Sequence, residues 1–152
     1  HDDMVPIVMA CMNMAKQKVG ALIVIERYVA LNDVMQTGDT IDARINQRLI
    51  ENIFFKNSPL HDGAMVISKG RIKAAGCILP VSHNLDIPKE LGLRHRAALG
   101  ISQVSDAQAI IVSEETGSIS VAHEGKFYLH LTPEELERIL TKKEESLIKK
   151  SE

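Results

Sequence analysis

The sequence predicts an α/β fold, a single globular domain with a central mixed β-sheet flanked by helices. Short apolar runs of strand length alternate with stretches in which apolar residues recur at helical spacing. Two strand pairs are joined by glycine turns, Lys69-Gly70 and Glu124-Gly125, and such tight hairpins require antiparallel pairing. The 152 residues, 45% of them hydrophobic, are enough for one core.

Each element is predicted from its pattern and its flanking turn residues. Apolar runs predict strands at 21–25, 64–68, 72–79, 107–112, 119–122 and 127–131. Helical spacing predicts helices over 7–18, from Asp42 through Phe54, over 88–100, and from Pro133 onward. Asp42 is expected to cap the second helix, and Thr132 with Glu135 forms a capping box for the last one.

The bulk composition excludes several classes of protein. A net charge of −2 argues against a broad nucleic-acid interface, so no nucleic-acid partner is expected. Aromatic residues make up only 3%, which argues against base-stacking platforms for single strands. Cys11 and Cys77 form neither a disulfide framework nor a metal motif, so a reducing compartment is the simpler interpretation.

No apolar run in the sequence is long enough to cross a bilayer, and the acidic start His1-Asp2-Asp3 is unlike a signal peptide. That start resembles an arbitrary cut, so the chain is expected to be a piece of a longer protein. The stretch 142–152 is rich in charge and is expected to form a fraying tail.

The segment 59–64 (PLHDGA) places a carboxylate beside an imidazole on a glycine turn that opens into a predicted strand. Gly63 permits close approach of a ligand to the backbone, and the small Ala64 leaves room for it. Asp62 is therefore a candidate to accept a proton or hold a metal, with His61 as a metal ligand. Taken alone, the segment is better explained as a common Pro-x-x-Asp-Gly turn. The His-Asp pair of metal phosphohydrolases fits poorly, because those enzymes place it in a helical domain.

Two guanidinium groups flank an imidazole in Arg94-His95-Arg96. The planar fork of arginine suits phosphate. Successive residues within a helix do not share a face, so these three side chains converge only at a helix start or in a loop. A solvated basic helix face is an equally good explanation of two arginines. The small residues Ala97, Ala98 and Gly100 favour a tightly packed functional segment.

The segment 113–117 (SEETG) places Glu114 and Glu115 at the end of a buried strand, where α/β sites usually open. One of these carboxylates is a candidate cation ligand, although an acidic turn between two strands is the better explanation of the segment taken alone. The glycines are scattered singly and form neither a phosphate-binding P-loop nor a dinucleotide fingerprint.

In combination these motifs resemble one family, the diadenylate cyclases, which make cyclic di-AMP from two ATP. The motifs occur in the order of that family, at 20–24 (GALIV), 37–38 (TG), 59–64, 75–80 (AGCILP), 94–98 (RHRAA) with Gly100, and 113–117 with Ile119-Ser120. The resemblance runs from about Gly20 to about Leu131, and the Asp-Gly-Ala and Arg-His-Arg pair is specific to the family.

The chain resembles in particular the membrane-anchored branch, in which transmembrane helices precede this domain. That implies an N-terminal helix and linker at 1–19 following a missing anchor, a catalytic domain at 20–140 and a charged tail at 141–152. The full-length protein is then expected at the cytoplasmic face of the cell membrane with regulatory protein partners, and this fragment is expected to be soluble.

The resemblance also implies roles for individual residues. The catalytic set is expected to be Asp62, Gly63, Ala64, Arg94, His95 and Arg96. ATP binding is expected to involve Gly76, Ile78, Leu79, Leu93, Arg94, Arg96, Ser113 and Glu114. A divalent metal is expected on His61, Asp62 and Glu115, with Glu114 as the alternative to Glu115. A histidine ligand favours Mn²⁺ or Co²⁺, with Mg²⁺ as a third option.

Cyclic di-AMP has two equivalent phosphodiester bonds, so a head-to-head homodimer with one ATP in each protomer is expected to serve both bonds with one set of residues. Two positions depart from the family pattern. Leu93 stands where Thr is usual, and Ile78 stands where close relatives often carry Tyr. Base binding is then expected to rest on apolar contact and on the backbone near Leu79.

Two other functions remain open from the sequence. The first is a nucleotide-binding regulatory module without catalysis, to which Leu93 gives some weight. The second is a DNA-associated scanning protein, as in the branch with added helical domains. A single domain with a net charge of −2 gives that second function little support.

Overall fold

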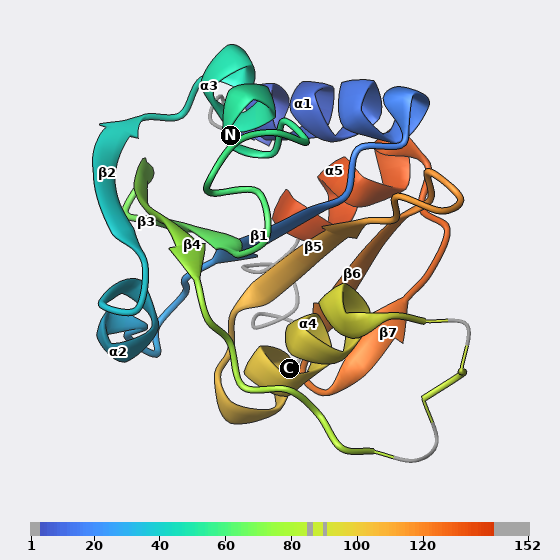
Figure 1. Cartoon of the computed structure of the whole chain (residues 1–152). Coiled ribbons are helices and arrows are strands. Elements are labelled where there is room, and N and C mark those ends of the chain that lie inside the picture. The colour runs from blue at the N-terminus through green and yellow to red at the C-terminus, as the bar shows by residue number, and fades with distance from the viewer. Residues whose placement is uncertain (1–3, 85–86, 90, 142–152) are drawn as a thin grey trace.

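A seven-stranded mixed sheet runs through the centre of the protein (Figure 1). The structure, a computed structural model, describes residues 4–84, 87–89 and 91–141. The strands are β1 (Ala21–Ile25), β2 (Asp39–Arg44), β3 (Ala64–Ser68), β4 (Arg71–Cys77), β5 (Gln108–Val112), β6 (Ile119–His123) and β7 (Lys126–Tyr128). Their order is β2-β4-β3-β1-β5-β6-β7, in which β1 and β3 are parallel and the other neighbours antiparallel. This confirms the predicted mixed sheet.

Helices cover both faces of the sheet (Figure 1). They are α1 (Met4–Gln17), α2 (Asn32–Met35), α3 (Gln47–Ile53), α4 (Leu93–Val104) and α5 (Pro133–Thr141). One core cluster joins α1, α3 and α5 to alternate strand residues such as Ile23, and a second joins α4 to the intervening residues such as Leu22. Because both faces are covered, β1, β3 and β5 are buried along their whole length and read as continuous apolar runs.

The N-terminal helix α1 packs into the first core cluster through Ile7, Ala10, Cys11 and Met14. Burial raises the pKa of the Cys11 thiol to about 12, so this cysteine is an inert core residue. The predicted helix over 7–18 is thus confirmed, with a start earlier than expected.

One prediction in the N-terminal half is wrong. Asp42 does not cap a helix but lies in β2, a strand that the sequence did not predict, at a register shift with φ of 52°. Its carboxylate accepts a 2.8 Å hydrogen bond from Nε of Arg71, and this contact lowers the pKa of Asp42. The helix cap is Asn46, whose side chain accepts from the backbone N–H of Leu49. The segment between β1 and β2 contains the short helix α2, which lacks an apolar period and was not predicted.

Several boundaries also differ from the predictions. Helix α4 begins at Leu93 rather than Pro88, after the extended residue Gly92, and continues through Gly100 to Val104. Strands β4 and β7 end earlier than predicted, and β4 ends just after Gly76, which has a φ of 67°. The predicted capping box is confirmed: Thr132 and Glu135 exchange hydrogen bonds at the start of α5. The predicted tail at 142–152 lies outside the described residues.

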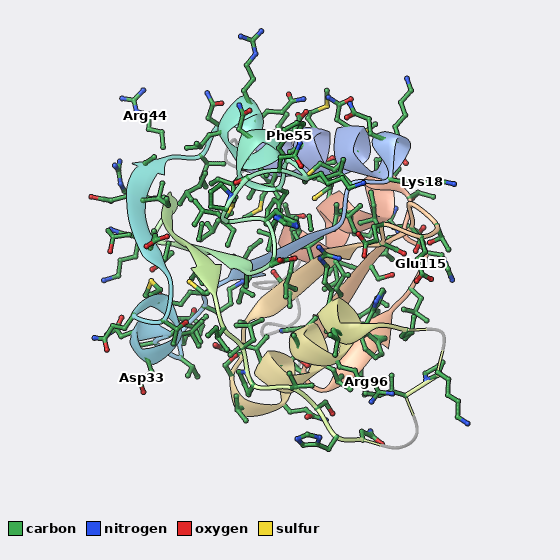
Figure 2. All side chains as sticks on the ribbon, viewed as in Figure 1. Lys18, Asp33, Arg44, Phe55, Arg96 and Glu115 are labelled. Atoms are coloured by element: carbon green, nitrogen blue, oxygen red, sulfur yellow. The ribbon has the colours of Figure 1, made fainter. Side chains whose placement is uncertain are left out.

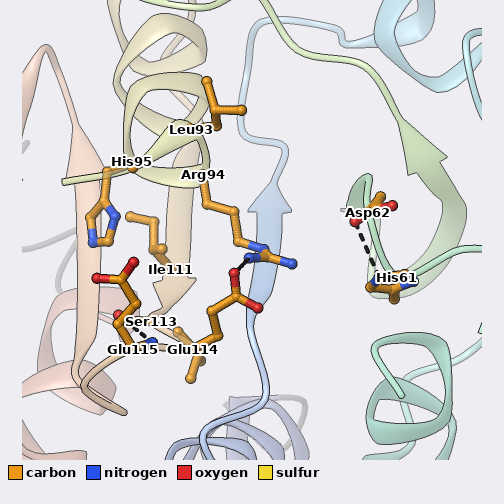
Figure 3. Close-up of a pocket in the computed structure, with 11 residues that line it drawn as sticks. His61, Asp62, Leu93, Arg94, His95, Ile111, Ser113, Glu114 and Glu115 are labelled. Carbon is orange, nitrogen blue, oxygen red and sulfur yellow. Dashed lines mark hydrogen bonds and ion pairs between the residues drawn. The ribbon is translucent and has the colours of Figure 1, made fainter. Parts of the chain in front are cut away.

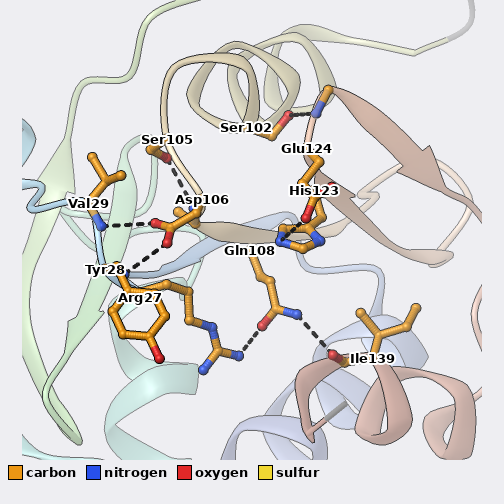
Figure 4. Close-up of polar contacts among 12 residues, drawn as sticks. Arg27, Tyr28, Val29, Ser102, Ser105, Asp106, Gln108, His123, Glu124 and Ile139 are labelled. Atoms are coloured by element: carbon orange, nitrogen blue, oxygen red, sulfur yellow. Dashed lines mark hydrogen bonds and ion pairs between the residues drawn. The ribbon is translucent and has the colours of Figure 1, made fainter. Parts of the chain in front are cut away.

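A polar network joins the residues that follow β1 to the start of β5 (Figure 4). The Asp106 carboxylate accepts 3.0 Å hydrogen bonds from the N–H groups of Tyr28 and Val29. Arg27 donates to the side chain of Gln108 and to a carbonyl in the last turn of α5, and Gln108 donates to the Ile139 carbonyl. The network ties α5 to the sheet. Within the described residues, no helix combines the length and the apolar character needed to span a membrane.

Candidate nucleotide-binding and catalytic site

Two adjoining cavities lie beside the first turn of α4, with volumes of about 600 Å³ and about 380 Å³. Both are lined by Asp62, Leu93 and Arg94, so they form one continuous cleft. The larger cavity carries most of the charged side chains and is called the polar cavity, and the smaller one is mostly apolar and is called the apolar cavity. A cleft with a charged end and an apolar end matches a ligand that has a charged part and an apolar part.

The polar cavity is built from three segments that are distant in sequence (Figure 3). The loop before β3 contributes His61 and Asp62, the start of α4 contributes residues 92–95, and the end of β5 with the following turn contributes residues 111–115. The register of β1 against β3 and β5 brings these segments together, since β1 lies between the other two strands.

Arg94 extends from the first turn of α4 into the polar cavity (Figure 3). Its Nη1 lies 3.4 Å from Oε1 of Glu114, and its side chain is 22% exposed. This ion pair involves Nη1, so the other guanidinium N–H groups remain available to a ligand. The arrangement suits binding of an anion such as a phosphate.

His61 and Asp62 lie on the opposite side of the polar cavity from Glu114 and Glu115 (Figure 3). Nδ1 of His61 is 2.7 Å from the carbonyl oxygen of Ser58, which can only accept, so Nδ1 carries a proton. Nε2 of His61 then faces Oδ1 of Asp62 at 3.1 Å. A neutral His61 would therefore present its lone pair beside a carboxylate oxygen, which is the pairing that a cation bridges. Asp62 itself is 86% exposed and so is open to a ligand.

The apolar cavity lies at the end of β4 and is lined by Leu22, Pro59, Ala64, Gly76, Cys77, Ile78, Leu79, Val81 and Ala97 in addition to the shared residues. Gly63 and Gly76 form its floor by close backbone approach: a Cβ on Gly63 would lie 2.4 Å from the Cα of Gly76. Gly63 is therefore required for this approach, and Gly76 is favoured by its φ of 67°. The predicted residues Gly63, Ala64, Gly76, Ile78 and Leu79 are brought together here.

His95 and Arg96 take different directions from Arg94. His95 lines the polar cavity but is buried, with its ring 6.1 Å from that of Phe127 in an edge-on arrangement. Burial lowers the pKa of His95, with smaller contributions from His130 and Arg94, so its neutral form is favoured. Nη1 of Arg96 is 3.4 Å from the Asn84 carbonyl, beside the loop that precedes α4 (Figure 2). Arg96 lines neither cavity.

The three expected metal ligands do not meet at one point. Glu115 lies on the His95 side of the cavity, across from the His61–Asp62 pair (Figure 3). Among the described residues, no three or more His, Cys, Asp and Glu side chains form a group that can hold a metal. The His61–Asp62 pair fits a metal that takes its remaining ligands from a bound phosphate and water, as is usual for metals that accompany nucleotides.

Sequence reasoning missed Leu22, Val81 and Ala97 of the apolar cavity, because isolated apolar residues give no signal that separates cavity walls from core. It also attached no role to Thr37, whose hydroxyl accepts a 2.8 Å hydrogen bond from the N–H of Ile78 at the lip of the cavity. Thr37-Gly38 was noted only as part of a family motif.

Comparison with known families identifies the domain. The family model described as DisA bacterial checkpoint controller nucleotide-binding, DAC, matches residues 8–127. The chain belongs to this DAC family. Its cleft residues, from Leu22 to Glu115, lie within the matched range.

Curated relatives include the cyclic di-AMP synthase CdaA of Bacillus subtilis, 50% identical over 127 residues, and a diadenylate cyclase of Listeria monocytogenes, 47% identical over 129 residues. These alignments cover 84% and 85% of this chain but 46% and 47% of the relatives. The chain therefore spans about half the length of these relatives.

Two solved structures are similar to this one. DacA from Staphylococcus aureus, in a double-mutant form, superposes with a TM-score of 0.91 at 46% identity and covers 93% of this chain and 94% of that one. A hypothetical membrane-spanning protein from Bacillus cereus superposes with a TM-score of 0.83 at 41% identity, covering 87% and 65%. Both likenesses support the single-domain α/β fold.

Proposed function

We propose that this protein is a diadenylate cyclase that joins two ATP molecules into cyclic di-AMP with release of two pyrophosphates. The observation that carries the proposal is the continuous cleft, in which Asp62 and Arg94 stand where the apolar cavity meets the polar one. The family membership and the names of the relatives support the same activity.

The two cavities suit the two ends of ATP. The adenine lies in the apolar cavity, between Ile78, Leu79 and Ala97. The triphosphate lies in the polar cavity, where Arg94 neutralises its charge. The ribose is then level with the shared residue Asp62, which places the 3′-OH beside a carboxylate.

Each of the two bonds forms by the same substitution. The 3′-oxygen of one ATP attacks the α-phosphorus of the other, the bond from that phosphorus to the β-phosphate bridging oxygen breaks, and pyrophosphate leaves. Asp62 orients the hydroxyl and accepts its proton. Arg94 stabilises the charge that develops on the phosphoryl oxygens, and neutral His95 helps to position the first turn of α4.

His61 and Asp62 are the residues that would hold a divalent metal, with Mn²⁺ or Co²⁺ favoured over Mg²⁺ because one ligand is an imidazole. A metal bound there would supply positive charge that orients and neutralises the phosphates. Glu115 joins the set only through the bound ligand, since it lies across the cavity.

A single cleft of this size holds one ATP, whereas the product contains two nucleotides. A second copy is therefore needed, and a two-fold arrangement with facing clefts serves both bonds identically. The exposure of the cleft rim supports this proposal: Asp62 is 86% exposed by side chain, and Leu93 and Ile78 are 78% and 71% exposed. An anchor to the membrane and regulatory partners for the full-length protein are also proposals, drawn from the family resemblance.

The direct test is incubation of the purified domain with ATP and Mn²⁺, then with Co²⁺ and Mg²⁺, followed by ion-exchange separation and mass detection. A cyclic di-AMP peak that is lost in Asp62→Asn supports the proposal. ATP binding without product under every metal, at high protein concentration, would instead indicate a nucleotide-binding regulatory module.

A further inference from the structure

The guanidinium of Arg94 lies in a space that exists only because residue 20 is glycine. A Cβ on Gly20 would lie 2.6 Å from Cζ and 2.6 Å from Nη1 of Arg94, both far closer than atoms can approach. The guanidinium therefore packs directly over the Gly20 backbone. The sequence motif 20–24 predicts only a core strand, yet its first residue lies against the guanidinium of the cleft arginine.

The position of Gly20 is fixed from both sides. On one side α1 ends in a Schellman motif, with Lys18 at φ 54° and a 2.8 Å hydrogen bond from the N–H of Val19 to the carbonyl of Met14. On the other side Ala21 pairs with Val112 across β1 and β5. Continuing this register by one residue brings Gly20 level with Ser113, next to Glu114. The surface that receives Arg94 is thus rigid backbone.

Glu114 contacts the Arg94 guanidinium as well, from the side of the cavity. Its Oε1 lies 3.4 Å from Nη1 of Arg94, and its side chain is 64% exposed. A carboxylate in a cavity that takes a triphosphate repels that ligand, so its presence there calls for another role. Holding the guanidinium in one orientation is such a role, because a long flexible side chain otherwise loses rotamer freedom when a ligand binds.

We propose that Gly20 and Glu114 are positioning residues that orient Arg94 for the triphosphate before ATP binds. This inference rests on the proposed function, in which Arg94 binds phosphate. Gly20 supplies the space and Glu114 supplies the direction, so the free N–H groups of Arg94 face the cleft. Neither residue needs to touch the nucleotide.

The test is the substitution Gly20→Ala, measured with adenosine 5′-(α,β-methylene)triphosphate, an analogue whose α–β bond cannot break, in the presence of Mn²⁺. The added methyl group meets only the far end of a flexible side chain. We therefore expect a melting temperature within about 2 °C of wild type and an affinity about tenfold weaker by titration calorimetry, the size of one lost charge-assisted contact.

The background Arg94→Ala separates positioning from a general effect on the fold. Gly20→Ala should cause no further loss of affinity there, because the methyl group then meets empty space. An equal loss in both backgrounds, or no loss in the wild-type background, would overturn the proposal. So would wild-type protein that does not bind the analogue at all.

Glu114→Ala tests the proposed role of Glu114 by the sign of its effect on affinity. Removing a negative charge from an anion site should strengthen binding if the charge only repels, whereas loss of orientation weakens it. We expect an affinity weaker by about threefold or more, and stronger binding would refute the role of Glu114. Glu137→Ala, an exposed acid on α5 that lines neither cavity, is the control with the same charge change. Turnover of wild type to cyclic di-AMP is scored separately, so loss of the proposed function is distinguishable from loss of this inference.

Discussion

The Thr37 hydroxyl accepts a 2.8 Å hydrogen bond from the backbone N–H of Ile78. This bond joins the segment after α2 to the end of β4 and fixes the lip of the apolar cavity. The backbone of Gly38 lies close to that of Ala75, since a Cβ on Gly38 would lie 2.3 Å from the Ala75 carbonyl oxygen. The hydrogen bond to Thr37 fixes the backbone of Ile78, whose 71% exposed side chain lines the apolar cavity.

Ile78→Ala should weaken the binding of ATP by about three- to tenfold, because the apolar area that the base covers is lost. Ile78→Tyr should strengthen binding instead, since an aromatic ring stacks on adenine. Both affinities are measured by calorimetry with the non-cleavable analogue. Val104→Ala, at an equally exposed apolar residue on α4 that lines neither cavity, is the matched control. Unchanged affinity in Ile78→Ala would place the base elsewhere.

Asp62→Asn should lower turnover by about 10² to 10⁴, the usual contribution of a positioned acid or base. The affinity for the ATP analogue, measured without added metal so that the proposed metal role of Asp62 does not enter, should stay within about twofold, because Asn keeps the shape of the side chain. Initial rates and calorimetry on the same preparation measure both quantities. Asp33→Asn, an exposed acid on α2, controls for the change in net charge. Near wild-type turnover in Asp62→Asn contradicts the assigned role.

Arg94→Ala should weaken the binding of ATP by about ten- to a hundredfold, the range expected for charge-assisted contacts. Arg96→Ala should also weaken binding, but less, because Arg96 lines neither cavity and lies beside Asn84. The comparison is made by calorimetry with the analogue. A larger effect for Arg96 than for Arg94 would mean that the loop before α4 rearranges around the triphosphate.

Activity per protomer should rise with protein concentration, because one cleft holds one nucleotide and the product needs two. A dilution series that spans the monomer–dimer transition, followed by light scattering, measures this dependence. Specific activity should approach zero at the monomer end. A constant specific activity across the transition would exclude the facing-dimer arrangement.

Acid should destabilise the fold partly through His95. Its pKa in the folded state is lowered from the ordinary 6.5, chiefly by burial. Below that value the unfolded chain binds a proton that the folded protein does not, so the free energy of unfolding falls as the pH drops. His95→Gln should flatten this dependence below about pH 6.5, as measured by urea unfolding. An unaltered slope would mean that His95 charges equally in both states.

Much of the fold follows from local patterns. The buried runs of β1, β3 and β5, the hairpin at Lys69-Gly70 and the capping box at Thr132 each carry their own signal in a few adjacent residues. The failures occur where that signal is weak or ambiguous. Asp42 is a good capping residue, but its carboxylate pairs instead with Arg71, which is remote in sequence. Edge strand β2 has no buried face that would mark it as a strand.

The candidate site divides in the same way. The sequence determines that Asp62 stands on a glycine turn, that Arg94 and His95 lie on a helix, and that Glu114 follows a buried strand, because each is a property of neighbouring residues. That the helix begins at Leu93, which puts Arg94 in its first turn, was not predicted. Only the tertiary structure decides that Arg94 faces Glu114 over Gly20 while Arg96 points to Asn84. It also decides that Glu115 stands apart from His61. These directions depend on strand register and on backbone contacts between distant segments, and no local pattern specifies them.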